Sequence, residues 1–196
     1  IGALLGCVSL ASAADFNTYI GLAAGTFQLK YSQNSTLGYA GISKWTAGGF
    51  LKTGVKYGRF IGFELRTGIT GRVNDTVPAS VVGNPLPVNL TIGADNFFSY
   101  LIKPQFPIVE RYNLYGLLGG TAAKFSIIGG SGVGLSGQSL RTGFTYGLGL
   151  EYQFRLNGSL AIEWVEYWSD VPMFVALGTS SKASIRGLSV MVNKSF

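Results

Sequence analysis

The stretch FTYGLGLEYQF, from Phe144 to Phe154, alternates between two kinds of residue. Every second position is apolar or aromatic, namely Phe144, Tyr146, Leu148, Leu150, Tyr152 and Phe154. The positions between them are polar or glycine, and this period of two predicts a β-strand with two different faces. About 11 residues suffice to cross a bilayer when the strand is tilted. Aromatic ends and a leucine-rich centre are typical of a membrane barrel; a half-buried strand of a soluble sandwich or lipocalin-like barrel is the alternative.

The composition favours the membrane barrel over the soluble alternative. Charged residues make up 12% of the chain, against about 25% in soluble domains. No apolar run reaches the ~20 residues of a transmembrane helix, so the hydrophobicity is spread over alternate positions. Glycine is abundant, with 29 residues, and proline is scarce, with 6. Both numbers suit strands that close around a narrow interior.

The first residues are typical of a secretion signal. Residues 1–10 form an apolar segment, and Ala11-Ser12-Ala13 matches a signal-peptidase site. We therefore expect a signal-peptide remnant at 1–13 and one barrel domain at 14–196. The segment 4–7 also resembles a lipobox with Cys7 as the lipidated residue, and this alternative stays open. Cys7 is the only cysteine, so we expect neither a disulfide nor a structural zinc site in the barrel.

The formal net charge is +6, which restricts the classes of partner. A basic protein can bind nucleic acid, but the sequence contains no basic run and no nucleic-acid-binding motif. We therefore expect no nucleic-acid partner. On a membrane protein, the positive balance favours contact with anionic lipid headgroups.

Eight strands are expected along the chain. They cover residues 18–31, 46–57, 60–69, 92–103, 113–125, 144–154, 159–168 and 184–196. In the first strand, Ile20 and Leu22 share one parity whereas Phe27 and Leu29 share the other, so we expect a bulge near Gly25. Short connections alternate with long ones. This pattern predicts an all-β, eight-stranded antiparallel up-and-down transmembrane β-barrel.

The long connections are expected to be extracellular loops. They cover residues 32–43, 72–90, 126–139 and 169–182. Three of them contain unusually apolar segments, at 77–88, 126–135 and 171–178. These segments would either pack on each other over the barrel mouth or form a contact surface for a partner protein, a host surface or lipid.

Several segments in a fixed order point to a known family. They are YIGLAAG, YLIKPQFP, NLYGLLGG, GFTYGLGLEYQF and LAIEW, followed by a last strand that ends in Phe196. The chain resembles the small OmpA/OmpX-like, porin-like outer-membrane β-barrels over its whole mature length. The resemblance implies a multi-pass protein of the bacterial outer membrane that contacts outer-membrane lipid and lipopolysaccharide. It also allows an apolar vestibule for small hydrophobic molecules, as in OmpW-type barrels.

In this family the barrel-assembly machinery reads the last strand. The resemblance therefore implies that Val190, Val192 and Phe196 form the assembly signal. Lys194 departs from the aromatic or apolar residue that is usual at its position.

Charged side chains are expected on the interior parity of the strands. They are Lys52, Lys56, Glu64, Arg66, Glu151, Arg155 and Glu163. They could form a salt-bridge network that fills a sealed interior, or they could line and gate a narrow hydrated pathway. Aromatic residues are expected in two girdles at the membrane interfaces. They are Tyr57, Tyr152, Phe154, Trp164, Trp168 and Phe196.

The chain contains no histidine, which removes Ser-His nucleophile pairs, a histidine base and histidine metal ligands. We therefore expect no enzyme activity, no metal and no cofactor. The expected function is a structural, adhesion or docking role through apolar extracellular loops. The alternative is a small pore or channel for ions, small solutes or small hydrophobic molecules.

Overall fold

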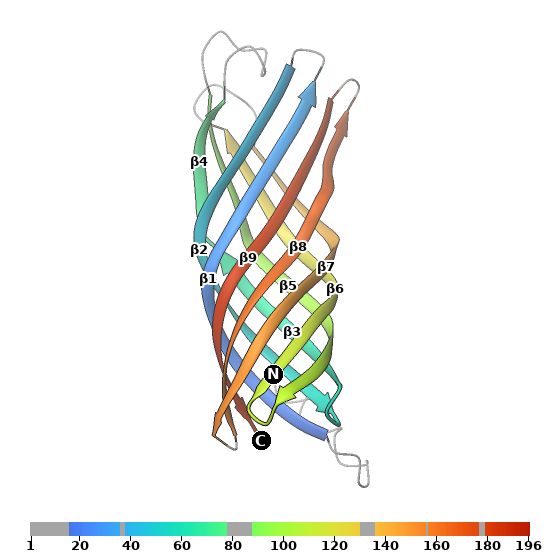
Figure 1. Ribbon diagram of the computed structural model, residues 1–196. Coiled ribbons are helices and arrows are strands. Elements are labelled where there is room, and N and C mark those ends of the chain that lie inside the picture. Colours follow the sequence, from blue (N-terminus) through green and yellow to red (C-terminus); the bar gives the residue numbers. More distant parts are fainter. Residues whose placement is uncertain (1–15, 36–37, 78–87, 130–135, 156, 177–178) are drawn as a thin grey trace, which may run out of the picture.

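The computed structural model describes residues 16–35, 38–77, 88–129, 136–155, 157–176 and 179–196. These residues form nine antiparallel strands (Figure 1). The strands are β1 Phe16–Ser35, β2 Gly38–Tyr57, β3 Ile61–Thr70, β4 Arg72–Val77, β5 Val88–Val109, β6 Tyr112–Gly129, β7 Ser136–Arg155, β8 Gly158–Ala176 and β9 Thr179–Ser195. The described part of the chain contains no helix long and apolar enough to cross a membrane. The predicted signal segment 1–13, with Cys7, lies outside the described residues.

The sheet closes into a barrel. Each strand pairs with the next one along the chain, except β3 with β4, and β1 pairs with β9. Gly71 separates β3 from β4, and both of these strands pair with β5. β3 and β4 therefore occupy one position in the wall, which gives eight positions and confirms the predicted eight-stranded antiparallel barrel.

Three tight turns join β2 to β3, β5 to β6 and β7 to β8 at one end of the barrel (Figure 1). At the first of them Gly58 has a φ of +60°, a left-handed conformation that glycine adopts without steric cost. We call the half of the barrel at this end the lower half, and the opposite half the upper half.

The prediction of four long loops is wrong over much of their length, because the strands continue into these residues. The ladder between β1 and β2 runs without interruption as far as Ser35 and Gly38. Likewise β4 covers 72–77, and β8 extends to Ala176. The polar and glycine residues of these segments are typical of loops. They also occur in a strand whose outer face contacts water, and this is why the prediction fails. The apolar segment 77–88 lies largely outside the described residues.

The outer face of the lower half is an apolar band. Leu22 of β1 and Leu148 of β7 expose 64% and 62% of their surface, a degree of exposure that is costly in water but favourable in lipid. Above the band, the outward residues of β1 are Thr26, Gln28 and Lys30. The outer wall therefore changes from apolar to polar about halfway along this strand.

The predicted bulge near Gly25 is wrong. β1 keeps its register with both β2 and β9 through this residue. Phe27 and Leu29 lie inside the barrel on the same parity as Tyr19, and both are fully buried. The apolar residues change parity because the interior becomes apolar where the outer wall becomes polar. A change of environment, rather than an extra residue, causes the phase shift in the sequence.

Candidate functional site: a buried charge network and its vestibule

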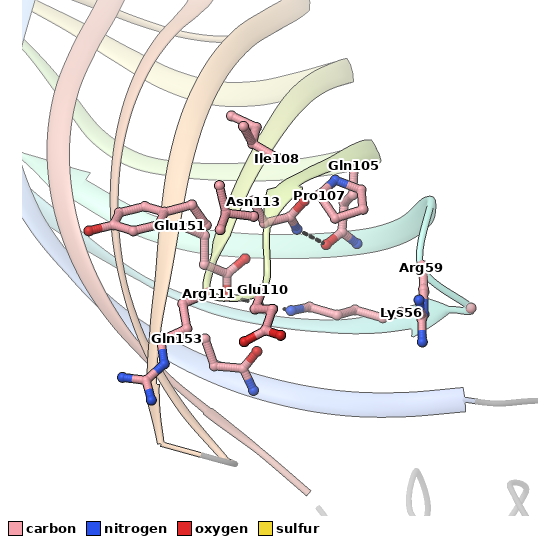
Figure 2. A pocket seen from close by; sticks show the side chains of 13 residues that line it. Lys56, Arg59, Gln105, Pro107, Ile108, Glu110, Arg111, Asn113, Glu151 and Gln153 are labelled. Atoms are coloured by element: carbon pink, nitrogen blue, oxygen red, sulfur yellow. Dashed lines mark hydrogen bonds and ion pairs between the residues drawn. The ribbon is translucent and has the colours of Figure 1, made fainter.

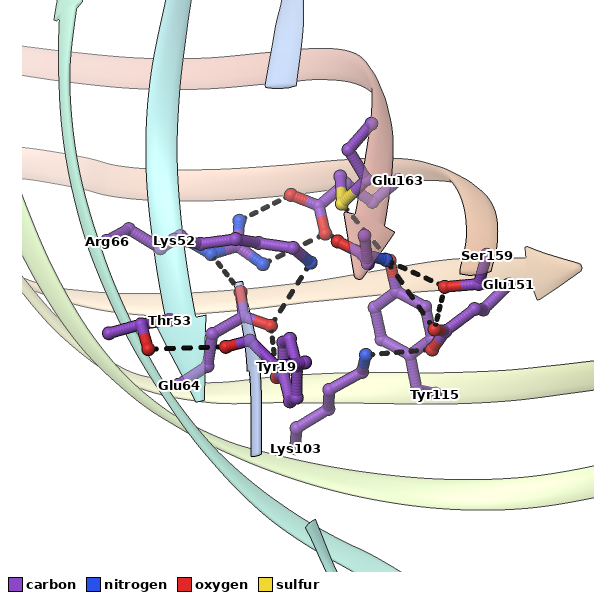
Figure 3. A network of polar contacts seen from close by, with 12 residues as sticks. Tyr19, Lys52, Thr53, Glu64, Arg66, Lys103, Tyr115, Glu151, Ser159 and Glu163 are labelled. Carbon is purple, nitrogen blue, oxygen red and sulfur yellow. Dashed lines mark hydrogen bonds and ion pairs between the residues drawn. The ribbon is translucent and has the colours of Figure 1, made fainter. Parts of the chain in front are cut away.

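The interior of the lower half contains a network of charged and polar side chains (Figure 3). Strands on opposite sides of the barrel contribute to it because every second residue of each strand points inward. Its members are Tyr19, Lys52, Lys56, Glu64, Arg66, Lys103, Tyr115, Glu151, Ser159, Glu163, Tyr167 and Asn193.

Arg66 is the centre of this network. Its Nε donates to Glu64 Oε1 at 2.5 Å, and its Nη2 donates to Glu163 Oε2 at 2.9 Å. A further hydrogen bond joins Nη1 to Glu163, and the same nitrogen lies 3.2 Å from the Tyr167 hydroxyl. The side chains of Arg66, Glu64 and Glu163 are fully buried or nearly so. One guanidinium thus connects β3 with β8 across the barrel.

Two lysines complete the pairing of the carboxylates. Lys52 Nζ lies 3.2 Å from Glu64 Oε2, which also accepts a 2.6 Å hydrogen bond from the Tyr19 hydroxyl. Lys103 Nζ lies 3.1 Å from Glu151 Oε2. Each buried carboxylate therefore has a cationic partner, which is required because an unpaired charge in a water-excluded interior is very costly.

Tyrosine rings also contact the lysine ammonium groups, through cation–π interactions. The Tyr19 ring lies 5.7, 5.5 and 5.3 Å from the Nζ atoms of Lys52, Lys56 and Lys103. The Tyr115 ring lies 4.0 Å from Lys103 Nζ. Tyr115 also donates its hydroxyl hydrogen to Glu163 at 3.0 Å. The negative faces of these rings attract the cations and reduce the repulsion among them.

An aromatic cluster lies directly above the network. The Phe97 ring centre lies 6.0 Å from that of Phe27, 6.1 Å from that of Phe50 and 5.2 Å from that of Tyr167. All four rings are buried. Tyr167 belongs to both groups, since its ring packs in the cluster while its hydroxyl contacts Arg66. The interior is therefore closed by charge pairs below and by close-packed rings above.

A hollow of about 610 Å³ opens below the network, at the turn end of the barrel (Figure 2). Strands β2, β5, β6 and β7 and their turns line it. Its charged and amide-bearing residues are Lys56, Arg59, Gln105, Glu110, Arg111, Asn113, Glu151 and Gln153. We call this hollow the vestibule. It ends at Lys56 and Glu151, which belong to the network.

The predicted interior charges are largely found where the sequence placed them. The network brings together Lys52, Glu64, Arg66, Glu151 and Glu163, with Lys56 at its lower edge. The side chain of Arg155 lies outside the described part of the structure. Sequence analysis missed Lys103, because apolar residues occupy both parities of the strand predicted at 92–103. It also missed the three tyrosines of the network. Within the described residues, no group of three or more His, Cys, Asp or Glu is placed to hold a metal.

The predicted girdle residues face outward, with one exception. Tyr57, Phe154, Trp164 and Phe196 are exposed on the outer surface, and Tyr152 packs its ring 5.0 Å from Tyr112 there.

Trp168 is the exception, and its assignment to the girdle is wrong. This residue is 0% exposed, donates from Nε1 to the Thr121 carbonyl at 2.9 Å and stacks on Phe125 inside the barrel. The register of β8 against β9 shifts between Glu166 and Trp168. This irregularity reverses the direction of the side chain, so strict alternation from Trp164 fails at this point.

The family model of the outer membrane protein beta-barrel domain matches residues 1–196. The chain belongs to this outer-membrane barrel family. No curated protein matches it. This membership agrees with the resemblance to OmpA/OmpX-like barrels that the sequence predicted.

Solved outer-membrane barrels share the fold of this family member. The outer membrane protein OprG from Pseudomonas aeruginosa is 12% identical, with a TM-score of 0.56 and coverage of 94% of this chain and 96% of that one. The neisserial surface protein NspA is 14% identical, with a TM-score of 0.52 and coverage of 91% and 97%. The outer membrane protease OmpT from Escherichia coli is 11% identical, with a TM-score of 0.53 and coverage of 96% and 99%. At these identities the likeness concerns the fold alone.

Proposed function

We propose that this outer-membrane barrel is a plugged, non-enzymatic barrel with a structural or docking role in the bacterial outer membrane. The observation that carries the proposal is the doubly closed interior. Arg66 and its two carboxylates close the interior of the lower half, and the rings around Phe97 close it directly above them. A barrel of eight strands is only wide enough for such side chains, so a continuous water path has no room.

The length of the strands supports a role outside the membrane. A membrane strand needs about 9–11 residues, whereas β1 and β2 have 20 residues each. About ten residues at ~3.3 Å each, tilted by about 40°, raise the wall roughly 25 Å above the apolar band. The polar upper half would thus stand in water beyond the outer leaflet, with the tight turns in the periplasm. In this orientation it offers surface to lipopolysaccharide and to a protein partner.

The last strand fits the proposed assembly signal. Val190 and Val192 face outward in the apolar band, and Phe196 is 71% exposed next to β1. In the proposed role, the barrel-assembly machinery binds this apolar face before the barrel closes. Lys194 also faces outward, near the lower membrane interface, where a lysine can extend its ammonium group to the headgroups.

The test is single-channel conductance of the refolded chain in a planar lipid bilayer. We expect a silent bilayer, together with a heat-shifted gel mobility that demonstrates correct folding. Discrete, salt-dependent current steps that change in Arg66→Met would contradict the plugged barrel. They would support the alternative, a small pore lined by the interior charges.

A further inference from the structure

The charge network carries more positive than negative charge. Its ion pairs join four cations, Lys52, Lys56, Arg66 and Lys103, to three carboxylates, Glu64, Glu151 and Glu163. In a medium of low dielectric constant, an excess charge is unfavourable unless an anion balances it. The described residues of the network do not supply that fourth anion.

Lys56 is the cation with the weakest pairing. Its Nζ lies 3.5 Å from Glu151 Oε1, the longest ion pair of the network. That oxygen already accepts a 2.5 Å hydrogen bond from Ser159, and the other carboxylate oxygen pairs with Lys103 at 3.1 Å. The side chain of Lys56 is 23% exposed and lines the vestibule. The excess positive charge is therefore located where a solute can reach it.

Gln105, in the same hollow, independently indicates that a hydrogen-bond acceptor is missing there. This residue is only 2% exposed, and its Oε1 accepts a 2.7 Å hydrogen bond from Asn113 Nδ2. Its Nε2 is itself buried and has no hydrogen-bond partner among the described residues, and the same holds for Oδ1 of the neighbouring Asn113. Buried N–H donors are almost always paired in folded proteins. Gln105 and Lys56 both line the vestibule, and the amide lies above the lysine side chain (Figure 2).

We infer that the vestibule binds a carboxylate. One carboxylate oxygen accepts from Lys56 Nζ, and a rotation of the Gln105 amide towards the hollow lets the other accept from Nε2, so the ligand supplies both the missing charge and the missing acceptor. Arg59 and Arg111 at the rim attract anions, whereas Glu110 opposes them. A single negative charge balances the network, while the second charge of a phosphate dianion would face Glu110 and Glu151. A hollow of about 610 Å³ has room for a carboxylate on a larger solute or on a peptide end.

The experiment is an NMR titration of the full chain, refolded in detergent micelles, at constant ionic strength. The signals are the side-chain amide of Gln105 and the ammonium of Lys56. The probes are acetate, acetyl-alanine, the amide of acetyl-alanine, phosphate and chloride. We expect saturable shifts with the two carboxylates, weaker ones with phosphate, and none with the amide or chloride.

Variants connect the binding to the two donors. We expect Lys56→Gln to weaken binding at least tenfold and Glu110→Gln to strengthen it several-fold. Gln105→Glu should abolish binding because the new carboxylate supplies the missing anion itself. The matched control is Lys44→Gln, which removes an exposed lysine of the upper half and should leave the affinity unchanged. Heat-shifted gel mobility verifies that each variant is folded.

Three results would overturn the inference. They are equal shifts with chloride or with the amide, unchanged affinity in folded Lys56→Gln, and tighter binding of phosphate than of acetate. The titration requires neither a membrane potential nor an extracellular partner. A conducting barrel would therefore contradict the proposed function without affecting this result, and a failed titration would leave the plugged barrel intact.

Discussion

The two halves of this barrel have opposite polarity although the same strands build both. In the lower half, apolar residues such as Leu22 face outward and charged residues such as Arg66 face inward. In the upper half, Phe27 and Leu29 face inward while Gln28 and Lys30 face outward. The lower half follows the rules of a membrane barrel and the upper half those of a soluble one. The position at which the pattern reverses therefore marks the upper edge of the apolar band.

The two interiors also resist change for different reasons. In the lower half, stability depends on every charge having its partner, so the loss of one side chain leaves others unpaired. In the upper half, stability depends on filled volume, which neighbouring side chains can partly restore. This difference leads to predictions that can be ranked by size.

The largest effect is expected for Arg66→Met. The substitution keeps most of the volume but leaves Glu64 and Glu163 with fewer cations, and breaking a buried ion pair in this way costs about 3–5 kcal/mol. Equilibrium unfolding in urea of the chain refolded in lipid vesicles measures the loss. The double variant Arg66→Met/Glu163→Gln should recover part of it, and Lys30→Met, which removes an exposed cation, is the matched control. A loss below 1 kcal/mol in Arg66→Met would mean that the lower half also depends on volume alone.

A smaller effect is expected for Phe97→Leu in the upper half. The shorter side chain leaves a partial cavity among the rings of Phe27, Phe50 and Tyr167, which corresponds to a cost of about 1–2 kcal/mol. The same unfolding measurement applies. The neighbouring Phe98→Leu is the control, because Phe98 faces outward with 47% of its surface exposed. An equal loss at both positions would show that the ring cluster is not a packed core.

The smallest effect is expected at the rim of the upper half, where Lys44 Nζ lies 3.1 Å from Asp75 Oδ1. The hydrogen bond from Lys44, assisted by the Thr76 backbone N–H, holds the pKa of Asp75 below its ordinary value. The pair therefore stabilises the fold above the ordinary pKa, and this contribution disappears as the pH falls through the lowered pKa of the folded state.

Both partners of this pair are well exposed, so its contribution is well under about 1 kcal/mol. An NMR titration of the Asp75 carboxyl carbon measures the pKa directly. Lys44→Gln should raise that pKa towards the ordinary value, and Lys30→Gln should leave it unchanged. A pKa that stays low in Lys44→Gln would assign the shift to the backbone hydrogen bond instead.

The membrane-embedded half was the more predictable part of the molecule. Alternation placed Glu64, Arg66 and Glu151 inside, because their neighbours along each strand are apolar and must face lipid. It could not place Lys103, since its strand has apolar residues on both faces, with Phe97 and Leu101 buried inside and Phe98 and Ile102 exposed outside. The assignment of Trp168 to the outer face failed because the backbone is irregular at this point. Such an irregularity cannot be recognised from the alternation of residues in the sequence.

The upper half was poorly predicted for a more general reason. A fixed rule that apolar residues face outward holds only within lipid, and it reverses once the wall enters water. The phase change at Gly25 therefore predicts a bulge that the structure does not contain. In the same way, the polar residues at the start of β2 predict a loop, whereas the strand already begins at Gly38. In both cases the strand is regular, and the surroundings of its outer face change from lipid to water.

The pairing of β1 with β9 means that the wall itself has no beginning and no end. The Phe196 N–H donates to the Thr18 carbonyl at 2.9 Å, so the last described residue lies beside the first strand at the turn end. A short linker between Phe196 and Phe16, with a new opening at Gly58, would produce a circular permutant that keeps every strand next to the same neighbours. The closed wall therefore depends on which strands are adjacent, whereas the order of the strands along the chain decides which of them comes last and, in the proposed role, carries the assembly signal.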